Sequence, residues 1–356
     1  MNWHKEKLED ILVFPEEKLL DVLTKMENAG MQVLIVVNNE RSILGIITDG
    51  DMRRALIKGR SLDTYVKEIM HPNPKVLKIS CATKEEAKKM MIKNSIRHIP
   101  LVDDLNRVQD IILWFDLFDN KLVPKSQNVV IMAGGEGTRL DPFTRILPKP
   151  MIPLGDKPII EVIMDKFYNQ GFSNFTLSLG YKAEIIKLYF KENNQKPYKI
   201  NYIQEDKPLG TAGSLALLKG VEKQSFILTN CDIIVEADYT DVLAYHKEKK
   251  FSITIIGALR DFTVPYGVLK IDKGSFQAIE EKPKFHFLVN TGVYIIEPEV
   301  LDLISLNESI DMTNLIARAQ NNGLKIGVYP YHGKWFDVGQ WEEYRQTLRF
   351  IEGKTR

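Results

Sequence analysis

The chain has 356 residues, of which 44% are hydrophobic and 27% charged, and its formal net charge is +1. This length accommodates two or three domains, and the composition is that of a soluble globular protein. The near-zero net charge gives no electrostatic basis for binding nucleic acid or an anionic membrane.

The first ten residues, MNWHKEKLED, contain no apolar signal core. The longest apolar stretches, such as Val33–Val37, are too short to cross a bilayer. Cys81 and Cys231 lie far apart, without the spacing of a disulfide framework or a metal site, which fits a reducing compartment. We therefore expect a cytoplasmic protein.

The front of the chain contains an internal repeat. Residues 11–52 and 76–117 match at one constant offset without a gap, so that Asp51 aligns with Asp116. Each copy predicts a strand, an amphipathic helix, two strands and a helix. Two such units are expected to pack together, because neither buries its apolar face alone.

The segment Gly45-Ile46-Ile47-Thr48-Asp49-Gly50-Asp51 resembles the G-h-h-T-x-x-D motif of cystathionine-β-synthase (CBS) domains. The resemblance implies a tandem CBS pair in residues 1–121, with repeats at about 8–65 and 73–121. It also implies that Thr48 holds a nucleotide phosphate and that Asp51 holds the ribose hydroxyls. A helix-start hydroxyl and a carboxylate suit an anion and a diol.

The second copy keeps Asp116 but has Leu113 where Thr48 would fall and Asp110 in place of Gly45. We therefore expect one full site for an adenine or guanine nucleotide and an incomplete second site at Asp116. The alternative is a structural pair that holds a homo-oligomer together, with Thr48 and Asp51 as helix caps.

Residues 120–128 (NKLVPKSQN) are polar, contain Pro124 and lack periodicity, which predicts a linker at 122–127 before a second domain at 128–356. Strands are predicted at Val129–Met132, 175–179, 200–204 and 226–228, and helices at 159–167, 183–190 and 211–218. This alternation predicts a Rossmann-like mixed sheet, mostly parallel, with helices on both faces. Ligands bind such sheets at the carboxyl ends of the strands.

The first of these strands runs through Ala133 into the glycine-rich segment 134–139, GGEGTR. Glycines let backbone N–H groups surround phosphate oxygens, and Arg139 and Lys149 add positive charge. With the later proline-lysine-proline, the stretch resembles the signature G-G-x-G-T-R-L…P-K-P of the sugar-1-phosphate nucleotidyltransferases. Beside Arg139, the nucleotide-binding residues that it implies here are Ala133, Gly134, Gly135, Gly137 and Thr138.

Two aspartates match the metal ligands of that family. Asp232 ends the segment Leu228-Thr229-Asn230-Cys231-Asp232, and Asp337 lies in Trp335-Phe336-Asp337-Val338-Gly339, which resembles W-x-D-x-G. The resemblance implies Mg²⁺ as the cofactor, a hard cation that needs only one or two protein carboxylates beside phosphate oxygens. An aspartate before a glycine is otherwise a common turn residue.

Further segments resemble the sugar pocket of the family. Glu280-Glu281-Lys282-Pro283 matches E-K-P, in which Glu281 would accept from sugar hydroxyls and Lys282 would hold the sugar phosphate. A solvated charge run is the alternative. Tyr266, Gly267, Asn290 and Thr291 match segments that line the same pocket.

Glu205, Gly210 and Thr211 lie in a segment that resembles the base-reading part of the family. Relatives that transfer thymidylyl or uridylyl groups usually carry glutamine at the position of Glu205. Guanine offers two adjacent donors, and a carboxylate accepts both, so Glu205 favours GTP. The alternative is that Glu205 faces solvent and Gln204 reads the base.

The resemblance implies an enzyme of the EC 2.7.7 class that converts NTP and sugar 1-phosphate into NDP-sugar and pyrophosphate. Arg139 would hold the β- and γ-phosphates, Lys149 the α-phosphate and Lys282 the incoming phosphate. A CBS pair ahead of such a domain further implies GTP and α-D-glucosamine 1-phosphate, on a route to legionaminic acid. The alternatives are mannose or heptose 1-phosphate, UTP or dTTP, and a non-catalytic CBS nucleotide sensor.

Overall fold

The computed structural model of the protein describes residues 3–94, 96–117, 124–192 and 197–353. The chain divides into two compact units, Met1–Lys121 and Leu122–Arg356. None of the described helices combines the length and the hydropathy needed to cross a membrane.

The first unit contains both repeats, and each has the expected order of strand, helix, two strands and helix. In the first copy these elements are β1 (Leu12–Val13), α2 (Leu19–Ala29), β2 (Val33–Val37), β3 (Ile43–Thr48) and α3 (Asp49–Ile57). In the second they are β5 (Leu77–Lys78), α4 (Lys84–Asn94), β6 (His98–Val102), β7 (Val108–Leu113) and α5 (Trp114–Leu117). Between the copies lies the short strand β4 (His71–Pro72), and α1 (Leu8–Ile11) precedes the first copy.

Each repeat forms its own small sheet, β1-β2-β3-β4 in the first and β5-β6-β7 in the second. All five residues of β2 are buried, as a strand covered on both faces requires. Helix α2 buries the stripe Leu19, Val22, Leu23 and Met26 and ends at Gly30, whose φ of 64° is the left-handed conformation common at helix C-termini.

The second unit is built on a seven-stranded sheet of order β12-β11-β8-β13-β18-β15-β19. Strand β18 is antiparallel to both of its neighbours, and every other adjacent pair is parallel. The predicted mostly parallel sheet is therefore confirmed. Its strands are β8 (Lys125–Ala133), β11 (Phe172–Leu179), β12 (Lys199–Gln204), β13 (Phe226–Asn230), β15 (Ile253–Thr263), β18 (Lys284–Ile296) and β19 (Ile326–Tyr331).

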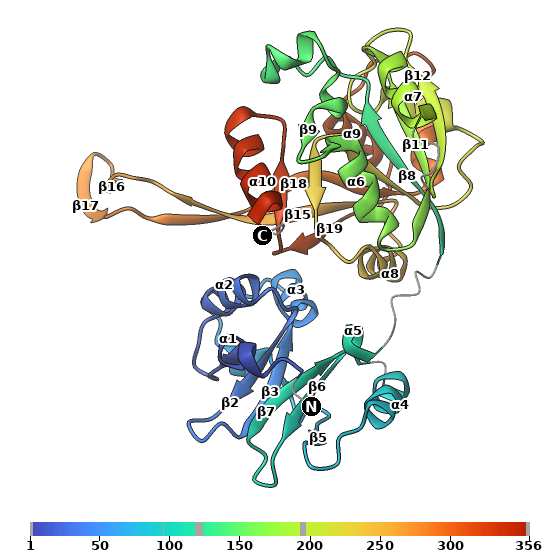
Figure 1. The fold of residues 1–356 in the computed structure, drawn as a ribbon. Helices are drawn as coiled ribbons and strands as arrows, with labels where there is room; N and C mark the ends of the chain where they lie inside the picture. Colours follow the sequence, from blue (N-terminus) through green and yellow to red (C-terminus); the bar gives the residue numbers. More distant parts are fainter. Residues whose placement is uncertain (1–2, 95, 118–123, 193–196, 354–356) are drawn as a thin grey trace. The chain divides into compact units, whose positions relative to one another are not determined.

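Helices cover both faces of this sheet (Figure 1). Successive residues of β8 point to opposite faces, so Val129 and Ile131 join one buried cluster while Val130 and Met132 join the other. The first cluster includes side chains of α6 (Ile159–Tyr168), α7 (Ala183–Glu192) and α8 (Tyr239–Lys249). The second includes side chains of the 3₁₀ helices η6 (Gly213–Leu218) and η7 (Pro298–Leu303) and of α9 (Met312–Asn321).

Two sequence-based boundaries differ from the structure. The helix predicted at 211–218 is the 3₁₀ helix η6, which starts at Gly213. The N–H groups of Thr211 and Ala212, just before it, bond to Asp311 and Ile310. Strand β8 starts at Lys125, inside the predicted linker at 122–127, and residues 122 and 123 lie outside the described residues.

Strands β15 and β18 continue past the sheet as a two-stranded arm, residues 259–289, with a short hairpin at its tip (Figure 1). The hairpin consists of β16 (Val268–Asp272) and β17 (Ser275–Glu280). Strand β19 pairs with β15 only as far as Ala258, so in the part of the chain that the structure describes the arm strands pair only with each other beyond that point.

Candidate active site

A cavity of about 370 Å³ lies at the carboxyl ends of the parallel strands β8, β12 and β13, as expected for such a sheet. The sequence-predicted residues among its lining are Gly134, Gly135, Gly137, Thr138, Arg139, Lys149, Glu205, Gly210, Thr211 and Asp232. The rest of the cavity lining consists of residues 132, 208, 209, 230 and 231. Ala133 ends β8 beneath the loop and is buried.

The glycines of the loop after β8 allow close approach of the chain. Gly137 has a φ of 70°, and a Cβ atom there would lie 2.7 Å from Cβ of Lys149. A Cβ atom at Gly134 would lie 2.7 Å from Oε1 of Glu205, whereas Gly135 faces open space. The loop therefore packs closely against Lys149 and Glu205, while Gly135 faces the open space in which a ligand would bind.

Lys149 and Asp232 form an ion pair in which the lysine ammonium donates to the carboxylate. Both side chains are mostly buried, with 12% and 14% of their surface exposed. Burial alone would lower the pKa of Lys149, but the carboxylate of Asp232, with help from Asp337, outweighs it and raises that pKa. Lys149 is therefore a fixed cation in the cavity.

Asp337 joins this pair through a second short sheet. Strand β14 (Ile233–Val235) pairs antiparallel with β20 (Trp335–Asp337), which sets Asp337 opposite Ile233, next to Asp232. A Cβ atom at Gly339 would lie 2.7 Å from Oδ1 of Asp337, 2.9 Å from Oδ2 of Asp232 and 3.1 Å from Nζ of Lys149. The two carboxylates and the ammonium converge over this glycine.

This arrangement fits a magnesium ion. Among the described residues there is no group of three or more His, Cys, Asp or Glu side chains that could enclose a metal. Two neighbouring carboxylates, of which that of Asp232 lines the cavity, suit a cation that takes its remaining ligands from water and phosphate.

The carboxylate of Glu205 is fixed from two sides. The Ser178 hydroxyl donates to Oε1 at 2.7 Å, and the Leu209 N–H approaches Oε2 at 3.4 Å. Ser178 is fully buried, and its hydroxyl also contacts that of Ser214 at 2.8 Å. Each carboxylate oxygen retains the capacity to accept a further bond.

Gln204, the alternative base-reading residue, points elsewhere. Its amide oxygen accepts from Lys187 on α7 at 3.0 Å, and Gln204 is not part of the cavity lining. Adjacent residues of a strand face opposite sides, so only one of the two can enter the cavity.

Thr211 is held by the start of α9. Its N–H donates to Asp311 at 3.1 Å, and its hydroxyl accepts from the N–H of Met312 at 2.8 Å. Gly210, with a φ of 75°, lets the chain pass within contact of Ile310. The segment is thus fixed by residues about a hundred positions later.

Arg139, in contrast, is exposed and makes no hydrogen bond or ion pair with the described residues.

The structure does not bring four of the predicted sugar-pocket residues into the cavity. Tyr266, Gly267, Glu281 and Lys282 lie on the arm, and Tyr266 is 74% exposed. The physical reason is that β15 and β18 keep their pairing as far as Thr263 and Lys284, which carries the intervening segment away from the sheet. A Cβ atom at Gly267 would lie 2.9 Å from Oε1 of Glu281, so these two residues remain close to each other.

Asn290 and Thr291 lie where β18 rejoins the sheet. Thr291 is buried, and its hydroxyl donates to the carbonyl of Ile256 at 2.8 Å, so it does not face the cavity. The amide of Asn290 donates to Tyr294 at 2.7 Å. The next residue but one, Gly292, would place a Cβ atom 2.9 Å from the amide nitrogen of Asn230, which does line the cavity.

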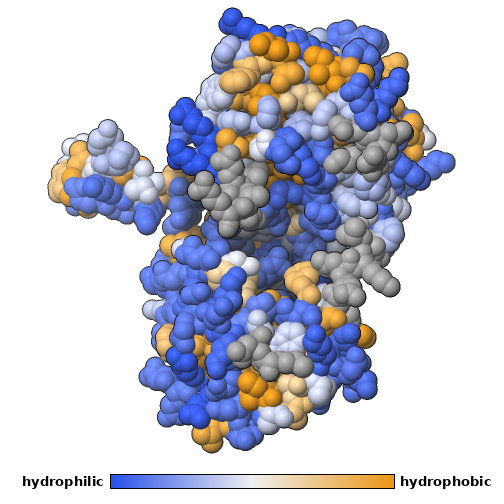
Figure 2. Space-filling model, in the orientation of Figure 1, coloured by the Kyte–Doolittle hydropathy of each residue, from blue (hydrophilic) through white to orange (hydrophobic). Residues whose placement is uncertain are grey.

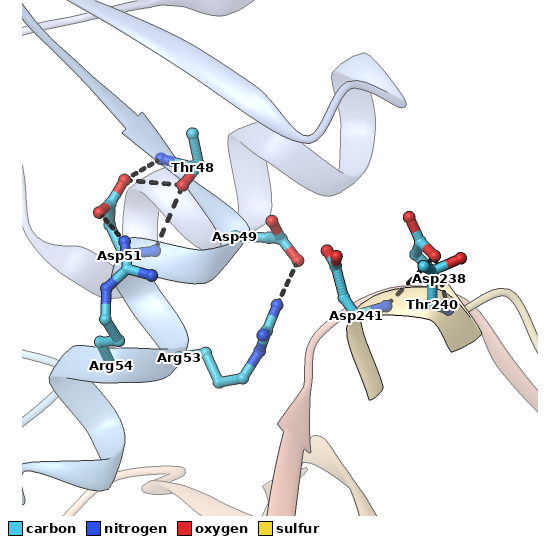
Figure 3. Close-up of polar contacts among 8 residues, drawn as sticks. All are labelled: Thr48, Asp49, Asp51, Arg53, Arg54, Asp238, Thr240 and Asp241. Carbon is cyan, nitrogen blue, oxygen red and sulfur yellow. Dashed lines mark hydrogen bonds and ion pairs between the residues drawn. The ribbon is translucent and has the colours of Figure 1, made fainter. Parts of the chain in front are cut away.

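In the first CBS copy, Thr48 and Asp51 form a reciprocal cap at the start of α3 (Figure 3). The Thr48 N–H and hydroxyl donate to Oδ2 of Asp51 at 2.9 and 2.7 Å, and Arg54 pairs with the other carboxylate oxygen. This is the geometry expected of helix caps. Both side chains remain partly exposed at the carboxyl end of β3.

In the second copy the chain's own N-terminal segment occupies the corresponding position. Asp110 is buried and accepts from the N–H groups of Trp3 and His4 at 2.7 and 2.8 Å. The His4 ring contacts both carboxylate oxygens of Asp116, at 3.0 and 3.1 Å. Asp110, which stands where the first copy has Gly45, therefore holds Trp3 and His4 in place, and His4 contacts Asp116.

Sequence reasoning missed the residues that position the site. Ser178, Ser214 and Asp311 orient Glu205 and Thr211, and Asn230 completes the lining. One signal was available for Ser178, a polar residue one position before the end of the predicted strand 175–179. Burial raises the pKa of the Cys231 thiol to about 12, so this cysteine is a packed, protonated side chain.

Known families match both parts of the chain. The sequence profile of the family described as "Nucleotidyl transferase" matches residues 128–354, and that of the CBS domain matches residues 9–58 and 66–122. A probable mannose-1-phosphate guanylyltransferase of Oryza sativa subsp. japonica is 34% identical over 230 residues, 62% of this chain and 63% of its own length. A UTP–glucose-1-phosphate uridylyltransferase of Synechocystis is 30% identical over 242 residues, 62% of either chain.

Solved structures resemble the second unit. HddC from Yersinia pseudotuberculosis complexed with GMP-PN has a TM-score of 0.52 and 27% identity, and the match covers 63% of this chain and 99% of that one. A putative glucose-1-phosphate thymidylyltransferase from Bacillus anthracis, 20% identical with a TM-score of 0.51 over 63% of this chain and 95% of its own, shares the fold.

The match spans less than two thirds of the length of the curated relatives named above. The family profile nevertheless covers well over half of this chain, including the glycine-rich loop, Lys149, Glu205, Asp232 and Asp337. The chain belongs to the nucleotidyl transferase family and carries CBS domains at its N-terminal end.

Proposed function

We propose that this protein transfers a nucleotidyl group, GMP from GTP by preference, to a sugar 1-phosphate and releases pyrophosphate. The observation that carries the proposal is the convergence of Lys149, Asp232 and Asp337 over Gly339. Lys149 and Asp232 line one cavity together with the glycine-rich loop and Glu205. A triphosphate, a cation and a base each find a complementary group there.

The loop after β8 would bind the triphosphate. Gly134 and Gly135 let backbone N–H groups approach phosphate oxygens, and the exposed guanidinium of Arg139 would neutralise the β- and γ-phosphates. Lys149, a fixed cation in the cavity, would contact the α-phosphate, where negative charge increases during transfer.

Asp232 and Asp337 would hold Mg²⁺. When bound, the ion would neutralise phosphate charge and lower the barrier to the approach of one phosphate to another. In the resting chain Asp232 is paired with Lys149, so substrate binding must draw the lysine toward phosphate and free the carboxylate.

No protein base is needed, because a sugar 1-phosphate is already a competent nucleophile at neutral pH. The work of the site is therefore positioning and charge neutralisation, as in other phosphoryl transfers. Cys231 takes no part as a nucleophile, since burial keeps its thiol protonated.

Glu205 supports the preference for guanine. Ser178 holds one of its oxygens in place, and both oxygens can accept from the two adjacent donors of the base. A guanylyltransferase among the relatives and a similar structure complexed with GMP-PN support the same nucleotide.

For the sugar we propose α-D-glucosamine 1-phosphate, with GDP-glucosamine as the product on a route to legionaminic acid. The support is the resemblance in domain order, a CBS pair ahead of the transferase. Glu281 and Lys282 lie on the arm, outside the cavity that contains Lys149. They would contact the sugar and its phosphate only in a conformation that brings the arm to the cavity beside Lys149. Mannose or heptose 1-phosphate is the alternative, favoured by the mannose-1-phosphate relative.

We also propose that the CBS pair binds one adenine or guanine nucleotide through Thr48 and Asp51. Both side chains stay partly exposed, and nucleotide binding would replace bonds of the helix cap. Asp116 is engaged by His4, so the second copy is closed to such a ligand. The protein would act in the cytoplasm.

A pyrophosphate-release assay over a grid of nucleotides and sugar phosphates tests these assignments. GTP with glucosamine 1-phosphate and Mg²⁺ should give the highest kcat/KM. Higher activity with mannose 1-phosphate would show that the sugar assignment is wrong. Higher activity with UTP would show that the base assignment is wrong. No release with any pair, together with nucleotide binding to the front end, would favour a CBS nucleotide sensor without catalysis.

A further inference from the structure

The arm, residues 259–289, exposes many large apolar side chains. Its described strands carry aromatic and aliphatic side chains that the rest of the second unit leaves uncovered. All six residues of β17 are exposed. An isolated two-stranded ribbon is marginally stable in water, so this one needs a partner surface.

The hairpin at the tip has one apolar and one polar face. Pairing of Leu269 with Ile279 and of Ile271 with Phe276 places these four side chains on the same face. They are 53–67% exposed. On the other face Lys270 pairs with Glu280 at 2.8 Å. This alternation is that of a strand pair with one buried face, although nothing buries it within the hairpin.

The base of the arm has a second apolar strip. Phe262 pairs with Phe285, and Phe287 lies on the same face, with ring centroids 5.7 Å from Phe262 and 6.4 Å from Phe285. The three rings are 42–54% exposed. Arg260 is held at one end of the strip by the Trp335 carbonyl, at 2.6 Å, and by the face of the Trp335 ring. The rings are thus ordered against each other while still facing water.

The exposed area matches that of a stable protein interface. Five aromatic side chains of the arm (residues 262, 266, 276, 285 and 287) are 42–74% exposed. At roughly 150–250 Å² for a whole aromatic side chain, they leave roughly 500–600 Å² uncovered. With Leu269, Ile271 and Ile279 the total approaches the about 800 Å² that each partner buries in a standard interface. Apolar and charged side chains lie side by side on this arm (Figure 2).

The charges of the arm indicate which partner fits. Residues 259–289 contain five Lys or Arg and four Asp or Glu, so the arm is nearly neutral, like the whole chain at +1. Lys270 pairs with Glu280, so part of this charge is already compensated. A nucleic acid, an anionic membrane or a strongly charged protein therefore has no electrostatic advantage here. Two copies of a neutral, apolar surface can meet without repulsion.

We propose that the arm is the dimerisation surface of this protein, and that its apolar strips pack against the same strips of a second copy. Such a contact is isologous, which means that the same surface of both copies forms it around a two-fold axis. Both arms are then buried in one dimer, and no arm remains free to bind a third copy. This interface is separate from the CBS pair, for which the sequence suggested a role in oligomerisation.

The first experiment measures the mass of the full chain in solution by sedimentation equilibrium over a range of concentrations. The wild type is expected to be a dimer. Phe276→Glu combined with Ile279→Lys, which puts charges on the apolar face at no change in net charge, should raise the dimer dissociation constant by at least about 30-fold. The matched control, Lys270→Ala combined with Glu280→Ala on the polar face, should leave it unchanged.

The second experiment does not depend on how the variants fold. Chains with Phe276→p-benzoylphenylalanine are prepared with ordinary and with heavy nitrogen, mixed below the dimer dissociation constant so that subunits exchange, concentrated, irradiated and digested. Cross-linked peptides that join an arm of one label to an arm of the other are the expected product. A monomeric wild type, a dimer unaffected by the apolar-face variant, or cross-links that join only peptides of the same label would each overturn the proposal.

Discussion

The ammonium of Lys149 donates to the carboxylate of Asp232, and a side chain at Gly339 would displace both. The pair joins a group from the proline-flanked segment before α6 to a group at the end of β13. Without substrate, Lys149 is thus paired with Asp232, the carboxylate that we assign to the metal. Cation and lysine must compete for Asp232 until a triphosphate draws the lysine away.

The first prediction follows from this competition. Lys149→Met should tighten the binding of Mn²⁺, used as a probe for Mg²⁺, in the absence of nucleotide, because Asp232 loses its ammonium partner. The same variant should lose turnover. Electron paramagnetic resonance titration measures free Mn²⁺ directly, and Lys219→Met, an exposed lysine outside the cavity, is the control. Weaker Mn²⁺ binding to Lys149→Met than to the wild type would contradict the competition.

Asp232→Asn and Asp337→Asn should each reduce Mg²⁺-dependent turnover by at least about 100-fold, because an amide is a weaker ligand than a carboxylate. Circular dichroism and thermal unfolding should show a retained fold for Asp337→Asn, since the bond that Gly339 N–H donates to it at 2.9 Å can go to an amide oxygen. Near-normal activity in either variant would remove that residue from the metal site.

Glu205→Gln should lower kcat/KM for GTP more than for UTP, since an amide cannot accept both guanine donors. The loss of a hydrogen bond to a charged group corresponds to roughly 1.5–3 kcal/mol. Gln204→Ala is the matched control, because Gln204 contacts Lys187 outside the cavity. Equal losses for the two nucleotides would exclude Glu205 as the base reader.

The CBS pair should bind one equivalent of nucleotide. Calorimetric titration of the full chain separates the two copies: Thr48→Val with Asp51→Asn should abolish binding, whereas Asp116→Asn should not. A transferase-site contribution is subtracted with titrations in excess sugar-nucleotide product. If no nucleotide binds at millimolar concentration beyond the transferase site, the pair is better regarded as a structural module, as its capping geometry also allows.

His98 should make the first unit sensitive to acid. Burial, with a smaller effect of Arg97, lowers the pKa of His98 from 6.5 to about 4. Between these values the unfolded chain binds a proton at this residue that the folded chain does not, so the free energy of unfolding falls as the pH drops from 6.5 to 4. One proton limits the slope to about 1.4 kcal/mol per pH unit. Hydrogen exchange of peptides from β6 should show this loss in the wild type and a smaller loss in His98→Gln.

Local patterns predicted the sheet and the loop well, because they depend on neighbours in sequence. The apolar run Val129–Met132, the glycines after it and the 65-residue offset of the repeats all correspond to observed elements. What could not be predicted depends on distant residues. The bonds of Thr211 to Asp311 and of His4 to Asp116 join positions more than ninety residues apart, and no periodicity encodes them.

The arm is the clearest example. The family resemblance implies a place for Lys282 and Tyr266 in the sugar pocket, but no local sequence pattern indicates how far their segment extends from the sheet. The continued pairing of β15 with β18 decides their position instead.

The most direct test of the proposed function is phosphorus NMR of the complete reaction. With GTP, α-D-glucosamine 1-phosphate and Mg²⁺, the wild type should produce pyrophosphate and a new diphosphate ester in equal amounts, and Asp232→Asn should produce neither. Release of inorganic phosphate from the γ-position, or consumption of GTP without the diphosphate ester, would contradict nucleotidyl transfer by this site.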